Sequence, residues 1–327
     1  MNEIDKLHKL GQSIWYDNIE RKLLKNGELE KMISLGEIRG VTSNPSIFQN
    51  AISKSTDYDD AIQPLAWSDW SAEDIFFQLA IEDIRETCDL FMSLYNQTNG
   101  ADGYVSLEVN PKLAYDTEGT VQQAKDLWQR VNRKNLMIKI PATKEGLPAI
   151  RKSIAAGLNI NVTLIFSIER YEEVIEAFLS GLEDRLSQNL AIDHIASVAS
   201  FFVSRVDSKI DSMLNILDEA NQTDKGKTAF LKGKVAIANS RLAYDLFERK
   251  FFSERFEKLI KSGAKVQRPL WASTSTKNPN YRDVVYVEEL IGDNTVNTMP
   301  PQTLDAFRDH GKAELRIKHD QAQANEV

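Results

Sequence analysis

The chain has 327 residues, of which 42% are hydrophobic and 27% are charged, a composition typical of a folded globular protein. This length accommodates one large domain or two ordinary ones, and a (β/α)8 barrel fits within it. The formal net charge of -8 argues against nonspecific nucleic-acid binding, because such binding requires a basic face. A few local cations would still admit a small anionic substrate.

Apolar, β-branched segments alternate with amphipathic segments along the chain. The predicted strands are 13–18, a brief one within 38–48, 103–111, 136–143, 159–166, 195–203, 268–274 and a weaker one at 294–300. The predicted helices are 3–14, 19–35, 48–63, 71–97, 117–132, 145–156, 168–188, several within 207–262 around a polar break at 221–226, then 280–291 and 301–310. Ser167 is expected to be the N-cap of the helix at 168–188.

Eight strands alternating with helices, without a linker between them, predict a single α/β domain. The fold class that fits this count is a closed (β/α)8 TIM barrel with extra helices, spanning residues 1–311. A doubly wound open sheet is the alternative, but the Gly-rich phosphate turn that such folds often carry is absent. Residues 312–327 read as a polar C-terminal tail that we expect to be loosely held.

The sequence also limits cofactors and compartment. The only cysteine, Cys88, rules out an internal disulfide and suits a reducing compartment. Four scattered histidines and one cysteine offer no metal-ligand spacing, so no metal site is predicted. No apolar run reaches the length of a membrane span, and the first residues do not resemble a signal peptide. We therefore expect a cytoplasmic protein with no membrane partner.

Lys139 is the residue on which the functional interpretation centres. It lies in the middle of the apolar strand 136–143, where burial disfavours the charged ammonium and favours a nucleophilic amine. Such an amine can form a Schiff base with a ketone. The alternative is a lysine that extends out of the strand end or pairs with an acid. The stretch alone does not exclude this alternative, and the other strand ends decide between the two.

In a barrel the chemistry lies at the carboxyl ends of the strands. The polar residues at or just after these ends are Asp17, Asn44, Glu108, Lys139, Asn161, Thr163, Ser200, Arg205, Ser273 and Lys277. Each has an ordinary alternative on its own, such as a helix cap, a turn, strand filler or an ion pair. The alignment of these residues in one layer favours a functional role over the ordinary alternatives, because burying a polar group without a partner costs free energy.

These residue types suit one reaction, the Schiff-base cleavage of a ketose. That reaction needs an amine, a group that moves protons during carbinolamine formation, and a base for the departing hydroxyl. Lys139, Glu108 and Asp17 supply these three types. Amides and hydroxyls can hold the sugar hydroxyls, while Arg205 and Lys277 offer charge-assisted bonds to a phosphate.

At these residues the chain closely resembles the transaldolase family, class I aldolase-type enzymes of the pentose phosphate pathway. The matching motifs are 40–46 (GVTSNPS), 105–109 (VSLEV) with 115–118 (YDTE), 137–143 (MIKIPAT), 161–167 (NVTLIFS) and 199–205 (ASFFVSR). They occur in the family's order and span most of the chain, from about residue 12 to 311. The resemblance to the longer bacterial and plant-type branch implies a (β/α)8 barrel and a transferase that needs no cofactor or metal.

The resemblance also implies roles for individual residues. Lys139 would form the Schiff base, Asp17 would be the acid/base for carbon–carbon cleavage, and Glu108 and Thr163 would act through a water during imine formation. The substrate-binding residues implied are Asn44, Asn161, Ser200, Phe202, Arg205 and Ser273. The reaction would move a dihydroxyacetone unit from sedoheptulose 7-phosphate to glyceraldehyde 3-phosphate, giving erythrose 4-phosphate and fructose 6-phosphate.

Two positions refine the resemblance. Phe202 favours transfer over cleavage, because the related fructose 6-phosphate aldolases tend to carry a tyrosine there and a phenylalanine cannot activate a water. Where many transaldolases have a second phosphate arginine after the seventh strand, residues 271–278 read WASTSTKN, and Lys277 would be the replacement cation. Longer members of the family continue with a further C-terminal helical segment, which is expected to be absent here.

Three functions stay open on the sequence. The first is transaldolase, the second a sugar-phosphate aldolase that releases dihydroxyacetone, and the third a non-catalytic barrel that binds sugar phosphates. The presence of Asp17, Glu108 and Lys139 speaks against the third. Sugar phosphates are the expected partners, and both a monomer and a homodimer are compatible with the sequence.

Overall fold

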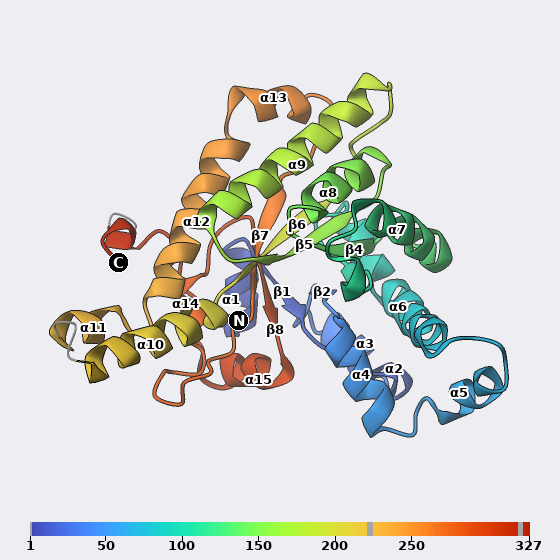
Figure 1. The fold of residues 1–327 in the computed structure, drawn as a ribbon, viewed down its shortest axis with the longest axis horizontal. Coiled ribbons are helices and arrows are strands. Elements are labelled where there is room, and N and C mark those ends of the chain that lie inside the picture. Colours follow the sequence, from blue (N-terminus) through green and yellow to red (C-terminus); the bar gives the residue numbers. More distant parts are fainter. Residues whose placement is uncertain (1, 221–224, 320–322) are drawn as a thin grey trace.

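The structure, a computed structural model, describes residues 2–220, 225–319 and 323–327. Eight parallel strands pair in sequence order, and β8 returns to β1 to close a barrel. Figure 1 shows the helices arranged around these central strands. The predicted single (β/α)8 TIM barrel is therefore confirmed.

The elements have the following bounds. The strands are β1 (Gln12–Tyr16), β2 (Gly40–Val41), β3 (Tyr104–Glu108), β4 (Leu136–Pro141), β5 (Ile160–Ile165), β6 (Ser197–Phe202), β7 (Gln267–Ala272) and β8 (Thr295–Met299). The α-helices are α1 (Glu3–Lys9), α2 (Arg21–Lys25), α3 (Glu28–Ser34), α4 (Pro45–Lys54), α5 (Asp59–Ala66), α6 (Ala72–Gln97), α7 (Thr117–Val131), α8 (Gly146–Ala155), α9 (Ile168–Ser187), α10 (Ser204–Glu219), α11 (Lys225–Leu231), α12 (Val235–Phe251), α13 (Glu254–Ile260), α14 (Val285–Glu289) and α15 (Pro301–His310). Two 3-10 helices are η1 (Pro111–Leu113) and η2 (Gln323–Asn325).

Strand β4 shows why the strand segments of the sequence are so apolar. All six of its residues are buried, as expected for a parallel strand covered on both faces. Ile138 and Ile140 belong to the large core cluster that includes buried side chains of the surrounding helices. Met137 belongs to a smaller cluster with Trp15 of β1, which the period of two places inside the barrel. Lys139 shares the inward face with Met137, so the strand's own periodicity points its amine into the barrel.

Four predicted helices differ from the observed ones. The helix predicted at 3–14 ends at Lys9 as α1, because Gly11 adopts a left-handed conformation with φ 88° and β1 begins at Gln12. The helix predicted at 19–35 is two helices, α2 and α3, because Gly27 adopts a left-handed conformation with φ 74° between them. The helix predicted at 48–63 is divided into α4 and α5 by the extended Ser55. The helix predicted at 280–291 shortens to α14, because residues 278–285 form turns: the backbone nitrogen of Tyr281 donates to the carbonyl oxygen of Asn278, and that of Val285 donates to the carbonyl oxygen of Arg282. The predicted polar break at 221–226 lies partly outside the described residues.

The C-terminal segment after α15 packs against the barrel. The backbone nitrogen atoms of Arg316 and Ile317 both donate to the carbonyl oxygen of Ile291, and Ile317 is only 2% exposed. The Arg316 guanidinium also lies 3.1 Å from a Glu289 carboxylate oxygen. The expectation of a loosely held tail is therefore wrong for residues 312–319, because Ile317 provides an apolar anchor within an otherwise polar segment. The division of the chain at residue 311 stays a prediction.

Candidate active site

Lys139 and Glu108 lie side by side at the carboxyl ends of adjacent strands. The register of β3 and β4 pairs these two residues directly, which brings the Lys139 Nζ within 3.5 Å of a Glu108 carboxylate oxygen. The same Nζ donates a hydrogen bond to the carbonyl oxygen of Ser43 at 3.2 Å. Lys139 is only 7% exposed, so its amine has little access to water. The contacts described for the amine are with these two oxygen atoms. Pairing of Lys139 with an acid was the alternative that the sequence allowed. The structure contains this ion pair, and it joins two candidate catalytic residues.

The Glu108 carboxyl has a perturbed affinity for protons. Burial raises the pKa of Glu108, the Lys139 ammonium opposes this rise, and the negative charge of Asp17 adds to it. The net effect is a pKa above the ordinary value of a glutamate. A carboxyl of this kind keeps its proton at higher pH than an exposed one, which suits a group that exchanges protons near neutrality.

Asp17 is oriented by two threonines. It follows β1, and its carboxylate oxygen Oδ1 accepts a hydrogen bond from the Thr42 hydroxyl at 2.6 Å. The Thr298 hydroxyl lies 2.5 Å from the same Thr42 oxygen. Because the single Thr42 proton is given to Asp17, Thr298 must donate to Thr42. The chain Thr298–Thr42–Asp17 therefore fixes the orientation of the carboxylate that faces the cavity.

Asn161, Ser106 and Ser200 form a hydrogen-bonded layer inside the barrel. The Asn161 side chain donates to the Ser106 hydroxyl oxygen at 3.0 Å and accepts from the Ser200 hydroxyl at 2.7 Å. These two bonds define the orientation of the amide. Ser200 reaches the cavity, whereas Asn161 is fully buried and does not line it. Asn161 is thus placed to orient Ser200, and its direct contact with substrate stays a prediction.

Asn44 lies at the start of α4 and also lines the cavity. It is the N-cap of this helix, and its side-chain oxygen accepts a hydrogen bond from the backbone nitrogen of Ile47 at 3.0 Å. Pro45 follows at the first helical position, which suits its fixed backbone angle. The cap occupies the amide oxygen, so the Nδ2 group is the part of Asn44 that can serve a ligand in the cavity.

The two predicted phosphate cations lie at the mouth of the cavity. The Arg205 guanidinium lies over the Phe202 ring, 4.9 Å from its centroid, and the Phe166 ring packs against Phe202 at 5.2 Å. Lys277 is exposed, and its Nζ donates to the Ser275 hydroxyl at 2.8 Å. Both cations line the same cavity.

These side chains surround one cavity of about 580 Å³. Of the residues predicted for the site, those that line it are Asp17, Asn44, Glu108, Lys139, Thr163, Ser200, Phe202, Arg205, Ser273 and Lys277. The cavity is also lined by residues that the strand pattern does not predict as site residues, among them Thr42, Asn50, Leu164, Ser275, Thr298 and Gln302. Thr42 lies inside the 40–46 motif, so the sequence did carry a signal for it.

Leu164 and Ser273 reach the cavity through unusual backbone angles. Leu164 has φ 61° at a register irregularity between β5 and β6, and the residue is 39% exposed and lines the cavity. Ser273, just after β7, has φ 57°, and its hydroxyl lies 3.0 Å from that of Ser204. Positive φ angles at such residues cost free energy and cluster at functional sites. Among the described residues, no group of three or more His, Cys, Asp or Glu side chains could hold a metal ion.

A closed barrel with a buried lysine amine beside carboxylates at its catalytic end fits the class of lysine-dependent aldolase-type enzymes. The family model described as transaldolase/fructose-6-phosphate aldolase matches residues 14–327. The chain belongs to this family. The transaldolases in it are transferases that act on sugar phosphates, and this is the function of the chain at the level that the family defines.

Curated relatives agree with this assignment. A transaldolase from Trichodesmium erythraeum (strain IMS101) is 48% identical over 319 residues, covering 97% of this chain and 84% of the relative. One from Saccharopolyspora erythraea is 50% identical over 309 residues, covering 94% and 82%. A transaldolase 2 from Nostoc sp. (strain PCC 7120) is 44% identical over 330 residues, covering 100% and 87%. No helix within the described residues is long and apolar enough to cross a membrane.

Proposed function

We propose that the chain transfers a dihydroxyacetone unit from sedoheptulose 7-phosphate to glyceraldehyde 3-phosphate, yielding erythrose 4-phosphate and fructose 6-phosphate. The observation that carries the proposal is the buried Lys139 amine, 3.5 Å from Glu108 in the cavity that Asp17 also lines. An amine, a proton-exchanging carboxyl and a second carboxylate are the groups that Schiff-base cleavage of a ketose requires.

The proposed sequence of steps begins at the ketone carbon. The Lys139 ammonium first gives a proton to Glu108, and the resulting amine attacks this carbon. Glu108, through a water held with Thr163, then returns the proton with which the carbinolamine loses water. Asp17 then takes the proton of the hydroxyl next to the breaking carbon–carbon bond, which releases an aldehyde and leaves an enamine on Lys139. The enamine carbon attacks the acceptor aldehyde, Asp17 returns its proton, and water hydrolyses the new imine.

Substrate recognition is proposed for the residues around this centre. Asn44 and Ser200 would hold the hydroxyls of the three-carbon unit, with Asn161 behind Ser200. Arg205, supported by its position over the Phe202 ring, would bind the phosphate together with Lys277 and the nearby Ser273.

Transfer is preferred to simple cleavage because of Phe202. Its ring forms part of the cavity wall and is packed between Phe166 and the Arg205 guanidinium. A phenylalanine ring has no hydroxyl that could deliver a proton to the enamine or activate a water. The enamine would therefore persist until an aldehyde acceptor arrives, and plain aldol cleavage would be slow.

The test is borohydride trapping with fructose 6-phosphate, followed by peptide mass mapping. The expected result is a reduced three-carbon adduct on Lys139, and no adduct in Lys139→Met. Lys234→Met is a matched control that changes a lysine outside the reaction cavity and should leave trapping unchanged. A folded sample without an adduct would favour a non-catalytic sugar-phosphate-binding barrel.

A second assay separates transfer from cleavage. Turnover of fructose 6-phosphate is measured with and without an acceptor aldehyde, because transfer requires the acceptor and cleavage does not. Release of dihydroxyacetone at the same rate without acceptor would favour the aldolase. Lys277→Ala with unchanged affinity for phosphorylated substrates would remove Lys277 from the proposed phosphate site.

We also propose that the protein works in the cytoplasm, as a monomer or a homodimer. The support for a reducing compartment is that the one cysteine, Cys88, is a buried free thiol. Sedimentation of the purified protein would distinguish the two oligomeric states.

A further inference from the structure

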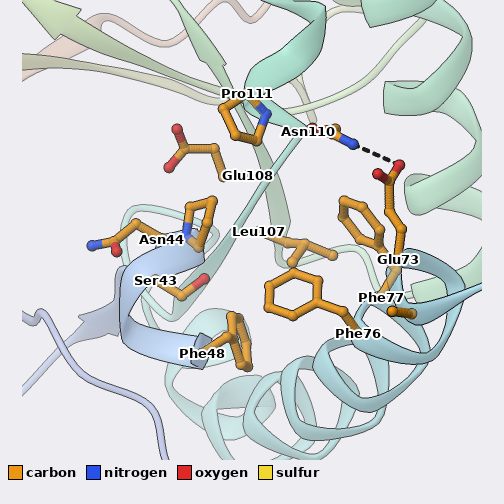
Figure 2. A pocket seen from close by; sticks show the side chains of 12 residues that line it. Ser43, Asn44, Phe48, Glu73, Phe76, Phe77, Leu107, Glu108, Asn110 and Pro111 are labelled. Carbon is orange, nitrogen blue, oxygen red and sulfur yellow. Dashed lines mark hydrogen bonds between the residues drawn. The ribbon is translucent and has the colours of Figure 1, made fainter. Parts of the chain in front are cut away.

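A second, smaller cavity adjoins the reaction cavity. It has a volume of about 290 Å³ and lies between the end of β3, the first turns of α4 and the start of α6. Its walls include Asn44, Pro45, Glu108 and Pro111, which also line the reaction cavity. Figure 2 shows Glu108 at one edge of this side pocket and Glu73 at the opposite edge, with Leu107 between them. The two cavities thus share a wall that contains a candidate catalytic carboxyl.

The inner surface of the side pocket is formed by aromatic and aliphatic side chains. The rings of Phe48 and Phe76 are nearly perpendicular at 83°, with centroids 6.1 Å apart, and Phe76 and Phe77 make a similar edge contact at 5.5 Å. Phe48 and Leu107 are almost fully buried. Edge-to-face clusters of this kind accept a further ring favourably, because ring edges and faces carry opposite partial charges.

The polar groups on the rim are already bound to each other. The Asn110 side chain donates to a Glu73 oxygen at 2.6 Å, a bond drawn in Figure 2, and Lys112 lies 2.9 Å from the other Glu73 oxygen. Asn44 is engaged as the N-cap of α4. A ligand in the side pocket would therefore be held by apolar contact with the rings.

The charges on the rim offer no binding site to the substrates of the reaction cavity. Glu73 is paired with Lys112 and Glu108 with Lys139, and the cations Arg205 and Lys277 line the reaction cavity but not the side pocket. An anion such as a sugar phosphate would meet no cation in the lining of the side pocket and would lose hydration against phenylalanine rings. The volume of the side pocket, its aromatic lining and the paired charges on its rim together favour a small, neutral, aromatic ligand.

We propose that the side pocket binds a small neutral molecule with one aromatic ring, and that its occupation slows turnover by displacing water from Glu108. Binding alone does not depend on the proposed function, whereas the effect on turnover does, because it acts through the water that Glu108 is proposed to use. A ring packed against Phe76 and Leu107 would reach the wall that Glu108 forms and replace the solvent on that side. Burial already raises the pKa of Glu108, and further loss of water would raise it more.

The test uses 4-fluorobenzyl alcohol as probe and fluorine NMR to measure its binding to the purified protein. We expect saturable binding that persists in the presence of saturating fructose 6-phosphate, because the two ligands occupy different cavities. Phe76→Leu, which keeps an apolar side chain but removes the ring, should raise the Kd about threefold to tenfold. Ala72→Phe, which fills the mouth of the side pocket, should raise it at least as much.

The matched control is Phe252→Leu, the same substitution at an exposed phenylalanine that follows α12, and it should leave the Kd unchanged. Displacement of the probe by fructose 6-phosphate, or an unchanged Kd in both side-pocket variants, would overturn the proposed site. Binding in the side pocket without a decrease in turnover would overturn the effect on Glu108. The proposed function is judged separately, by borohydride trapping and acceptor-dependent turnover without the probe.

Discussion

The hydrogen bond between Tyr281 and Asp211 connects the two segments that carry the proposed phosphate cations. Asp211 lies on α10, the helix that contains Arg205, and its carboxylate accepts a 2.6 Å hydrogen bond from the Tyr281 hydroxyl. Tyr281 lies in the segment after β7, four residues beyond Lys277. The other Asp211 oxygen accepts from the backbone nitrogen of Gly233, and the Tyr281 ring packs closely against that glycine. We predict that this bond sets the spacing between Arg205 and Lys277.

The perturbation is Tyr281→Phe, which removes the hydroxyl and keeps the ring. Asp211 is 8% exposed, so its carboxylate would lose a partner that water replaces poorly. A hydrogen bond to a charged group contributes about 1.5–3 kcal/mol, and the free energy of unfolding should fall by about that amount. Without this bond the two cations should move apart and bind the phosphate less tightly. The KM for glyceraldehyde 3-phosphate should then rise about tenfold, which corresponds to about 1.4 kcal/mol of binding free energy.

The assay compares glyceraldehyde 3-phosphate with unphosphorylated glyceraldehyde as acceptors, and urea unfolding measures stability. We expect the KM to rise for the phosphorylated acceptor alone, with kcat changed little for either. Tyr244→Phe is the matched control, because its hydroxyl donates to the carbonyl oxygen of Asp293, outside the residues that line the reaction cavity. An equal rise for both acceptors, or the same rise in Tyr244→Phe, would refute the reasoning.

Three further predictions concern the site and the fold. Because burial raises the pKa of Glu108, its contribution to stability is fully present below the unfolded value of about 4.3 and is lost as pH rises through the folded pKa. Urea unfolding should thus show Glu108→Gln gaining stability relative to the wild type as pH rises from 4 to neutrality, and a pH-independent difference would contradict this. Asn161→Ala leaves two buried serine hydroxyls without their amide partner and should cost about 1–3 kcal/mol of unfolding free energy, while Asn161→Asp should not restore the donor to Ser106. Ile317→Ala should cost about 2–5 kcal/mol in thermal or urea unfolding if the C-terminal segment is anchored as observed, and a cost near zero would show that the anchor is dispensable.

The order of strands and helices was predictable because it follows from local periodicity. Parallel strands buried on both faces give continuous apolar runs, and β4 is one of these. Helix ends were less predictable where a single residue decides them. Gly27 divides a long amphipathic segment only because it adopts φ 74°, and the irregularity that exposes Leu164 to the cavity depends on pairing between β5 and β6. Neither feature has a signature that periodicity alone can detect.

The candidate site was predictable to the extent that polar residues follow strands. The carboxyl ends of eight parallel strands meet on one face, so residues such as Asp17 and Glu108 are brought together by topology alone. Asn161 differs in position from the other predicted site residues. It lies near the beginning of β5 and therefore inside the barrel, beneath the cavity. Thr298 was not identified, because a threonine in a strand resembles β-branched filler until its partner is known. The side pocket depends on contacts between α4, α6 and β3, which sequence periodicity does not encode.

The two carboxyl groups beside Lys139 have different environments, and this difference supports the division of their proposed roles. Glu108 is buried, and its raised pKa leaves a proton beside the amine at higher pH than an exposed glutamate would. Such a proton is what the departing hydroxide needs during imine formation. Asp17 instead accepts a hydrogen bond from Thr42, which Thr298 holds in turn, so its free oxygen keeps one orientation toward the cavity. A fixed acceptor is what abstraction of a hydroxyl proton needs. If Glu108 and Asp17 had the same environment, the structure would not indicate which one acts as the acid and which as the base. The difference between their environments therefore supports the proposed mechanism.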